Sequence, residues 1–324
     1  MPDRPGLGRR VLCVVAGRGM LVGVALAVLA GAMVSAQETP EPRPVGDGPP
    51  LPYHSIEGTG GVFITPTAYL VNPGPPDTVF GKPAVSTHFA LIGDKDFESI
   101  TFTWTLWRRL ELGYGLDRLG LDDLPRDIRR ATGVDIGTHD IHLHHFNARF
   151  NVIEENQWDQ KWLPAVTAGA HYKYNDSVKA IDRRLGGALT GIGMDDNEGV
   201  DFTLTASKTL TCLPRPVILS AGARASKGAQ LGFLGFTDDY RVTFEGSVVT
   251  LLSNKFVLAA EYRQKPDELK RVPGLIGPED DWWDVCLGYI INDRLSVAAG
   301  VGNFGTVANH SDQMVYACCL KYEF

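Results

Sequence analysis

The stretch Met314-Val-Tyr-Ala-Cys-Cys-Leu-Lys-Tyr-Glu-Phe324 decides the fold class of this 324-residue chain. In an extended strand, successive side chains point to opposite faces. One face would carry Met314, Tyr316, Cys318, Leu320, Tyr322 and Phe324, and the other Val315, Ala317, Cys319, Lys321 and Glu323. A strand with one apolar and one more polar face suits a wall between hydrocarbon and a barrel interior. One strand can alternate by chance, so a barrel requires the same alternation in many other segments of the chain.

The same alternation recurs along most of the chain. Twelve runs of period two lie at residues 83–92, 98–107, 110–119, 139–151, 163–175, 199–209, 216–227, 238–251, 255–264, 282–291, 294–303 and 313–324. A tilted strand needs about 9 to 11 residues to cross a membrane, which most of these runs provide. The sequence therefore predicts an all-β fold, a twelve-stranded antiparallel transmembrane β-barrel of the bacterial outer membrane over residues 83–324.

The connections between the runs support this prediction. If Phe324 lies in the periplasm, the connections on the periplasmic side are 107–109, 154–162, 211–215, 252–255 and 292–293, all of them short. The long connections, 121–138, 176–198, 228–239 and 266–281, all fall on the other side. Short periplasmic turns and long extracellular loops are typical of outer-membrane barrels. A soluble β-sandwich has no reason to sort its loops in this way.

The N-terminal region predicts export. Several Arg residues precede the apolar run 20–34, which ends in the small-residue sequence Val34-Ser35-Ala36. This run is short of the roughly 20 residues that a membrane-spanning helix needs. We therefore predict a signal peptide over residues 1–36 and a Pro-rich flexible lead over 37–56. A thirteenth strand would break the alternation of sides and Pro66 would interrupt its ladder, so we predict a plug or periplasmic segment over 57–82.

Charge and cysteine content argue against a nucleic-acid-binding protein and against a disulfide or metal framework. Removing residues 1–36 takes away four Arg and one Asp, leaving 27 basic against 37 acidic residues and a net charge of −10. This acidic balance disfavours a nucleic-acid partner. The four remaining cysteines, at 212, 286, 318 and 319, predict no disulfide or metal framework.

Five segments carry a family resemblance: Gly60-Gly-Val-Phe-Ile-Thr-Pro-Thr-Ala68, Lys161-Trp-Leu-Pro-Ala-Val166, Gly232-Phe-Leu-Gly-Phe236, Ala260-Glu-Tyr-Arg-Gln-Lys-Pro-Asp267 and Glu279-Asp-Asp281. From about residue 57 to its end, the chain resembles a bacterial family of uncharacterised outer-membrane proteins known only as a domain of unknown function. The Thr-Pro-Thr segment is also similar to the start of exopolysaccharide-linked barrels. The closing Phe324 resembles the insertion signal of outer-membrane barrels. The resemblance implies the fold and leaves the activity open.

Charged side chains fall on the face predicted to line the lumen, because a charge on the lipid side at mid-membrane costs about 2 to 4 kcal/mol. The predicted pore-lining residues are Glu111, Asp117, Arg149, Lys173, Asp201, Arg224, Arg241, Glu245, Glu261, Arg263, Asp284 and Lys321. Two interpretations stay open: an open pore that selects solutes by charge, and charges that pair and fill the interior. Small lining residues such as Gly113 and Gly115 slightly favour open space.

His142 and His144 are the candidate metal ligands, with Asp140 on the same face. Solvated histidines beside an outer loop are the simpler explanation, and no third ligand is evident, so we expect no metal and no cofactor. Phe146 and Phe150 share the parity of these histidines and are apolar, so we predict a β-bulge near His144 or His145.

The function expected from these patterns is a passive channel for small polar solutes or a structural envelope protein. The alternatives are a barrel that assists export or anchoring of an extracellular polysaccharide and, less favoured, a lipid-modifying enzyme. No Ser or Asn pairs with His142 or His144 in a triad pattern, so we expect no enzyme. The expected partners are outer-membrane lipid, the barrel insertion machinery acting on the strand that ends in Phe324, and a periplasmic or polymer partner.

Overall fold

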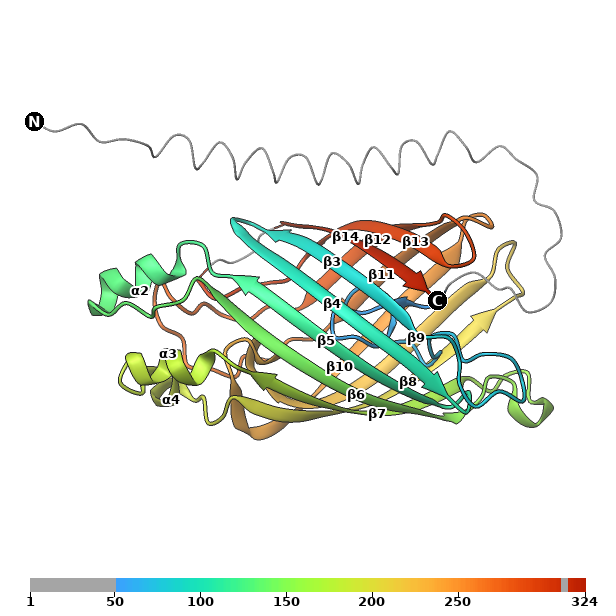
Figure 1. The fold of residues 1–324 in the computed structure, drawn as a ribbon, viewed down its shortest axis with the longest axis horizontal. Coiled ribbons are helices and arrows are strands. Elements are labelled where there is room, and N and C mark those ends of the chain that lie inside the picture. The colour runs from blue at the N-terminus through green and yellow to red at the C-terminus, as the bar shows by residue number, and fades with distance from the viewer. Residues whose placement is uncertain (1–50, 310–313) are drawn as a thin grey trace, which may run out of the picture. The chain divides into compact units, whose positions relative to one another are not determined.

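The computed structural model describes residues 51–309 and 314–324. The predicted signal peptide and most of the Pro-rich lead lie outside the described residues. Twelve strands form one closed antiparallel barrel in which each strand pairs with the next along the chain and β14 pairs with β3 (Figure 1). They are β3 (Ala84–Ile92), β4 (Lys95–Leu106), β5 (Leu110–Gly120), β6 (Asp140–Ile153), β7 (Ala165–Asn175), β8 (Glu198–Leu210), β9 (Val217–Gly228), β10 (Phe236–Leu251), β11 (Phe256–Arg263), β12 (Trp282–Ile290), β13 (Leu295–Asn303) and β14 (Met314–Glu323). The predicted fold class is confirmed.

The two faces of the barrel wall differ in chemistry. Large apolar side chains cover the outer face from many strands, among them Ile100, Phe102, Phe146, Phe202, Leu204, Val242, Phe244, Val285 and Leu320. Their sequence neighbours point inward and are buried, among them Thr101, Thr103, Asn147, Thr203, Thr243 and Lys321. A continuous exposed apolar belt around a closed barrel implies a lipid environment.

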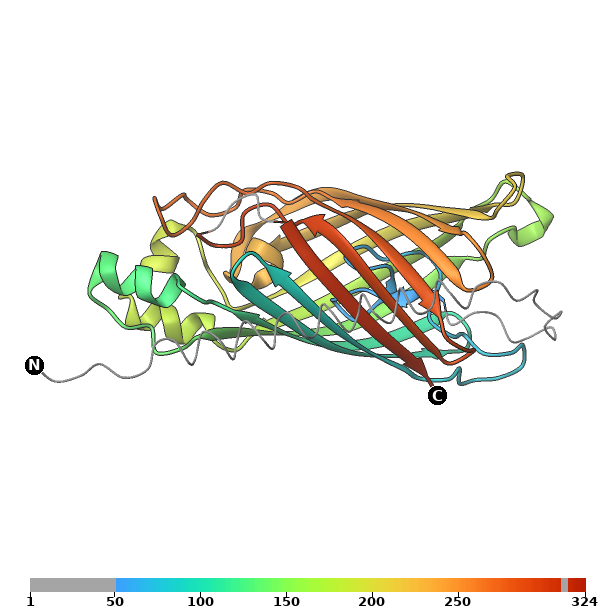
Figure 2. The same ribbon diagram turned by 90° about the horizontal axis from the view of Figure 1, so that it is seen from above.

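The barrel has two unlike ends. The turn end carries the short connections 107–109, 154–164, 211–216, 252–255 and 291–294 together with Phe324, and it includes the 3₁₀ turn η1 (Gln157–Asp159). The loop end carries α2 (Leu124–Thr132), α3 (Val178–Arg184), α4 (Ala188–Ile192) and η2 (Ala229–Gly232). Figures 1 and 2 show the three α-helices at one end and the C-terminus at the other. In the part of the chain that is described, no helix is long and apolar enough to cross a membrane.

The helices of the loop end cover the barrel mouth. Apolar side chains of α2, α3 and α4 meet around a small cavity of about 170 Å³. Its lining includes Leu124, Ile128, Ile181 and Leu189. The segment 176–198, which contains α3 and α4, therefore forms part of a cap at the loop end.

The predicted bulge near His144 is absent, because the pairing of β5 with β6 runs without interruption from Leu110 to Gly120. The irregularity in β6 lies at its other end, between Asn151 and Ile153, where it pairs with β7. The bulge prediction is wrong because the inward residues near the loop end, Ile141 and Leu143, are apolar. They pack under the helical cap, so an apolar inner face does not require a change of phase there.

Residues 51–72, called the inner segment below, lie within the barrel. They include β1 (Tyr53–His54) and β2 (Gly60–Gly61), which pair with each other as a two-stranded sheet. Nearly every side chain from 53 to 71 is buried. The predicted lead reached residue 56, but residues 51–56 already belong to this segment, since Tyr53 and Ile56 find apolar partners inside. The chain then runs to the turn end, where the Phe80 ring stacks on Trp104 at 5.1 Å.

Candidate functional site

The inner segment turns back at its deepest point through a tight loop at residues 55–59. The N–H of Ser55 donates to the carbonyl oxygen of Thr59 at 2.8 Å, and the two hydroxyls bond each other. Gly58 has a φ of +79°, and a Cβ there would lie 2.7 Å from the carbonyl oxygen of Tyr114. On the facing strand, a Cβ at Gly113 would overlap the carbonyl oxygen of Gly58. Gly113 and Gly115 therefore make room for this loop and not for open space.

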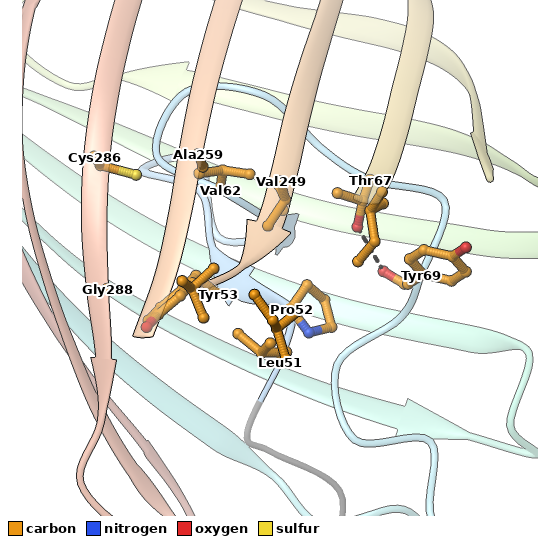
Figure 3. Close-up of a pocket in the computed structure, with 14 residues that line it drawn as sticks. Leu51, Pro52, Tyr53, Val62, Thr67, Tyr69, Val249, Ala259, Cys286 and Gly288 are labelled. Carbon is orange, nitrogen blue, oxygen red and sulfur yellow. Dashed lines mark hydrogen bonds between the residues drawn. The ribbon is translucent and has the colours of Figure 1, made fainter. Parts of the chain in front are cut away.

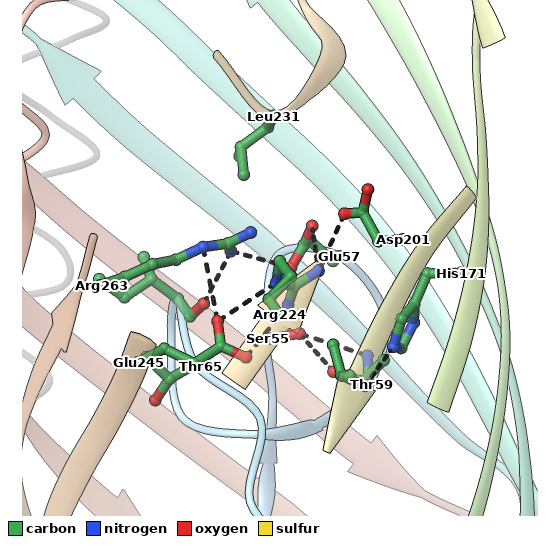
Figure 4. A network of polar contacts seen from close by, with 12 residues as sticks. Ser55, Glu57, Thr59, Thr65, His171, Asp201, Arg224, Leu231, Glu245 and Arg263 are labelled. Atoms are coloured by element: carbon green, nitrogen blue, oxygen red, sulfur yellow. Dashed lines mark hydrogen bonds and ion pairs between the residues drawn. The ribbon is translucent and has the colours of Figure 1, made fainter. Parts of the chain in front are cut away.

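Glu57, at this loop, lies at the centre of a buried ion network (Figure 4). Its carboxylate binds Lys173 at 2.5 Å, Arg263 at 2.9 Å and Arg224 at 3.0 Å. Two further carboxylates share these cations: Asp201 lies 2.8 Å from Lys173 and 3.1 Å from Arg224, and Glu245 lies 3.3 Å from Arg224. Three carboxylates thus face three cations, which is how a protein interior holds buried charge.

The network fixes the ionisation state of Glu57. Burial alone would raise the pKa of this carboxyl group. Arg224, Arg263 and Lys173 outweigh burial and hold the pKa well below its usual range. Glu57 is therefore an anion that ties the inner segment to strands β7, β9 and β11.

Glu261 holds the second bend of the inner segment. Its carboxylate accepts hydrogen bonds from the backbone N–H groups of Phe63 at 2.7 Å, Ile64 at 3.1 Å and Thr65 at 2.8 Å, and from the Thr65 hydroxyl at 2.6 Å. These donors lack backbone partners in a bend, so a carboxylate in the wall satisfies them.

Arg149 and Glu111 bind the returning half. Arg149 donates to Glu111 at 2.9 Å, to the carbonyl oxygen of Gly60 at 2.8 Å and to that of Thr67. Glu111 accepts from the N–H of Gly60 at 3.0 Å and of Val71 at 2.8 Å. This pair of neighbouring side chains on β5 and β6 therefore binds both donors and acceptors of the inner-segment backbone.

Eleven of the twelve predicted pore-lining residues are buried inside the barrel; besides those above, they are Asp117, Asp284 and Lys321. Asp117 lies 2.9 Å from His145, and Lys321 donates to the carbonyl oxygen of Pro52 and to Glu323. Arg241 is the exception. Its side chain is 59% exposed and pairs with Glu268 at 3.4 Å. It lies in the part of β10 that extends beyond the pairing with β11, which begins at Glu245.

Sequence reasoning missed Glu57 and His54, which lie in a segment without strand periodicity. The ring of His54 bonds the hydroxyls of Thr101 and Thr103, both at 2.9 Å. Burial, with Lys321 and His88 adding to it, lowers the pKa of His54 well below its usual value, so this ring is neutral. A single carboxylate among Ser, Thr and Gly residues, within the segment predicted as a plug, was the available signal for Glu57.

His142 and His144 point to the outer face of β6. His144 Nδ1 lies 2.9 Å from the Tyr114 hydroxyl, and both rings approach Asp176 only to 3.9 Å. Across the described residues, no group of three or more His, Cys, Asp or Glu side chains is arranged to hold a metal ion.

A closed twelve-stranded barrel with an apolar belt and a polar, occupied lumen defines an outer-membrane β-barrel. The chain belongs to the family described as "Protein of unknown function (DUF3034)", whose model matches residues 52–319. The matched region includes nearly all of the inner segment and the barrel wall up to Cys319.

Several solved structures are similar to this chain in the course of the backbone. The KdgM porin is 10% identical over 74% of this chain and 99% of its own, with a TM-score of 0.45. The NanC porin is 8% identical over 75% and 100%, with a TM-score of 0.45. The COG4313 outer membrane channel from Pseudomonas putida F1 is 11% identical over 77% and 99%, with a TM-score of 0.42. No curated protein sequence matches this chain.

Proposed function

We propose that the protein is a gated outer-membrane channel for small polar solutes, closed by its own inner segment. The observation that carries the proposal is the anchoring of this segment, with Glu57, Glu261 and Arg149 as its main contacts. A lumen filled in this way does not conduct until the segment moves. The turn end would face the periplasm, since short turns lie on that side of outer-membrane barrels.

The wall behind the inner segment supports passage of polar solutes. Strands β4 to β8 present hydroxyl, amide and charged groups inward, and most of these now bond the segment. If the segment leaves, the groups face water; they include Thr101, Thr103, Thr105, Glu111, Asn147, Arg149, Thr167, Asp201 and Ser207. Rings of such groups select solutes by charge and hydrogen bonding.

Conductance across planar lipid bilayers tests this proposal. We expect brief, infrequent openings of the wild-type protein and steady conductance after deletion of residues 51–72. A cysteine pair at Ala68 and Ser207, where the Ala68 N–H donates to the serine hydroxyl at 2.8 Å, should abolish openings when oxidised and restore them when reduced. The native cysteines are replaced by serine in all variants. Silence of both wild-type and deleted proteins would refute a channel function.

A second candidate, a permanently closed structural barrel, is favoured by the density of buried ion pairs around Glu57. It predicts that the deletion conducts but that the wild-type protein never does. The cysteine pair would then change nothing.

We further propose that the protein is not an enzyme, that it resides in the bacterial outer membrane, and that Phe324 presents the insertion signal. Phospholipid hydrolysis by purified protein would contradict the first statement. Loss of the protein from outer-membrane fractions when Phe324 is deleted would support the last two. Lost surface polysaccharide in cells lacking the protein, with no conductance, would instead favour the polysaccharide alternative.

A further inference from the structure

We propose that a pocket between the inner segment and strands β9 to β12 binds a single hydrocarbon chain. The pocket has a volume of about 300 Å³ (Figure 3). Half of its lining comes from the inner segment, including Tyr53, Val62 and Tyr69. The other half comes from the barrel wall: Ile218, Val249, Leu251, Val257, Ala259, Cys286 and Gly288. The inference goes beyond the proposed channel function and does not depend on it.

The chemistry of the lining selects an apolar ligand. Its wall side is aliphatic, in contrast to the hydroxyls and charges that β4 to β8 present on the far side of the inner segment. The three hydroxyls within it are already bonded to the protein: Tyr69 to Glu155 at 2.6 Å, Thr67 to the carbonyl oxygen of Tyr69 at 3.2 Å and Tyr53 to that of Val297 at 3.4 Å. An apolar cavity of about 150 Å³ already stays dry and takes up small apolar molecules. Water is therefore a poor occupant of this larger pocket.

The pocket is reached from the turn end. Its floor, formed by Val62, Ala259 and Cys286, is buried. Its half-buried members include Ile218 and Leu251, which lie beside the short turns 211–216 and 252–255. At that end Tyr69 also bonds Thr209 at 2.8 Å, and Lys208 binds Glu155 at 3.1 Å. An apolar floor below a polar rim suits a chain that leaves its polar group in water.

Size and lining together narrow the ligand class. Small-molecule sites range from about 300 to 1,000 Å³, and this pocket lies at the lower end of that range. It therefore takes one hydrocarbon chain and excludes a two-chain lipid. Its aliphatic wall favours an alkyl chain over an aromatic molecule. The chain could come from a free fatty acid or from one acyl chain of a membrane lipid that reaches around the turn end. In either case it would contact Val62 and Tyr53, and binding would stabilise the inner segment in its closed position.

Photocrosslinking in lipid nanodiscs tests this proposal. One arm uses free decanoic acid bearing a diazirine, and the other uses phosphatidylcholine with the same group on one chain. Adducts are mapped to single residues by mass spectrometry. We expect adducts on Val62 or Tyr53, which face away from the bilayer, and on Val249, Val257 or Ala259. The arm that yields them identifies the source of the chain.

Neighbouring residues on opposite faces supply matched controls. Ala259→Phe and Val249→Phe fill the pocket, whereas Ala260→Phe and Val248→Phe add the same volume on the outer face of the same strands. We expect the first pair to abolish the inward adducts and the second pair to leave them unchanged. Heat-modifiable mobility on gels identifies the variants that fold. If one of the two pocket-filling variants does not fold, the other still tests the proposal.

Two outcomes overturn the proposal. One is labelling confined to outward residues such as Val248 and Ala260 in both arms. The other is inward labelling that neither filling variant reduces, which would place the chain elsewhere in the lumen.

Discussion

Glu57 is the single side chain on which the closed lumen depends most, because its carboxylate contacts three cations at once. Glu57→Gln keeps the shape of the side chain but leaves three cations facing only Asp201 and Glu245. Removing one partner of a buried ion pair costs about 3 to 5 kcal/mol. We expect a loss of unfolding free energy of this size in urea titrations in phospholipid vesicles. Glu98→Gln is the control, since Glu98 is 54% exposed and lies 3.7 Å from Arg118, a surface pair worth about 0 to 1 kcal/mol. Equal effects of the two changes would contradict a central role for Glu57.

The same carboxylate should make stability depend on acid. Its pKa is lower in the folded protein than the ordinary 4.5 that the unfolded chain shows, because Arg224, Arg263 and Lys173 outweigh the effect of burial. The unfolded state therefore takes up a proton first as the pH falls. The stabilisation from Glu57 is fully present above about pH 4.5 and is lost as the pH drops through the folded pKa. The difference in unfolding free energy between wild-type and Glu57→Gln should shrink below that pH. A difference that stays constant down to pH 3 would show that Glu57 is not the group responsible.

Gly113 provides a way to displace the inner segment by changing only the wall. A valine side chain there would occupy the position of the Gly58 carbonyl oxygen, and backbone cannot give way as a flexible side chain does. We expect Gly113→Val to expel the loop 55–59 and to raise bilayer conductance, while the barrel still shows heat-modifiable mobility. Gly191→Val in α4 is the control, because no atom lies within 4 Å of the added Cβ. A Gly113→Val barrel as silent as the wild-type would mean that the loop can be moved without opening the lumen.

At the scale of elements, β7 and the cap depend on Asn175. Its amide donates to the carbonyl oxygens of Gly232 and Phe233 at 2.9 and 3.0 Å, and its oxygen accepts from the N–H groups of Ser177 and Val178 before α3. Asn175→Ala leaves these buried groups unpaired, at about 1 to 3 kcal/mol for each buried group left unsatisfied. We expect faster proteolysis within 176–198 and 229–235, with no change at the inner segment. Asn292→Ala in a turn at the opposite end is the control; unchanged cleavage in both variants would contradict this role.

The barrel strands could be predicted from the sequence, whereas the ion network could be predicted only in part. Alternation gave the strands, because a wall between lipid and polar lumen forces period two on every residue it contains. Arg241 alternates in phase with the inward residues of β10 but lies outside the lumen. Alternation predicts the face of a side chain and does not predict how far its strand extends. The residues that the wall contributes to the ion network were predicted from the sequence. Its central residue, Glu57, was not. Glu57 sits in a loop whose position depends on contacts from residues more than a hundred positions away, such as Lys173, and no local pattern encodes these.

At the scale of the whole molecule, the apolar belt predicts that a charged side chain lowers the unfolding free energy more within the belt than in a turn outside it. Leu204 lies midway along β8, is 55% exposed, and alternates with the buried Thr203 and Thr205. If this surface meets the hydrocarbon core, Leu204→Arg should lower the unfolding free energy in phospholipid vesicles by about 2 to 4 kcal/mol. Leu213, 46% exposed in the turn 211–216, would lie beyond the core, where the same change costs about 0 to 1 kcal/mol. The two leucines have similar exposure, so burial within the protein cannot account for a difference between them. Equal costs at both positions would show that the belt does not sit in a bilayer, and a larger cost at Leu204 would place the middle of β8 at the membrane centre.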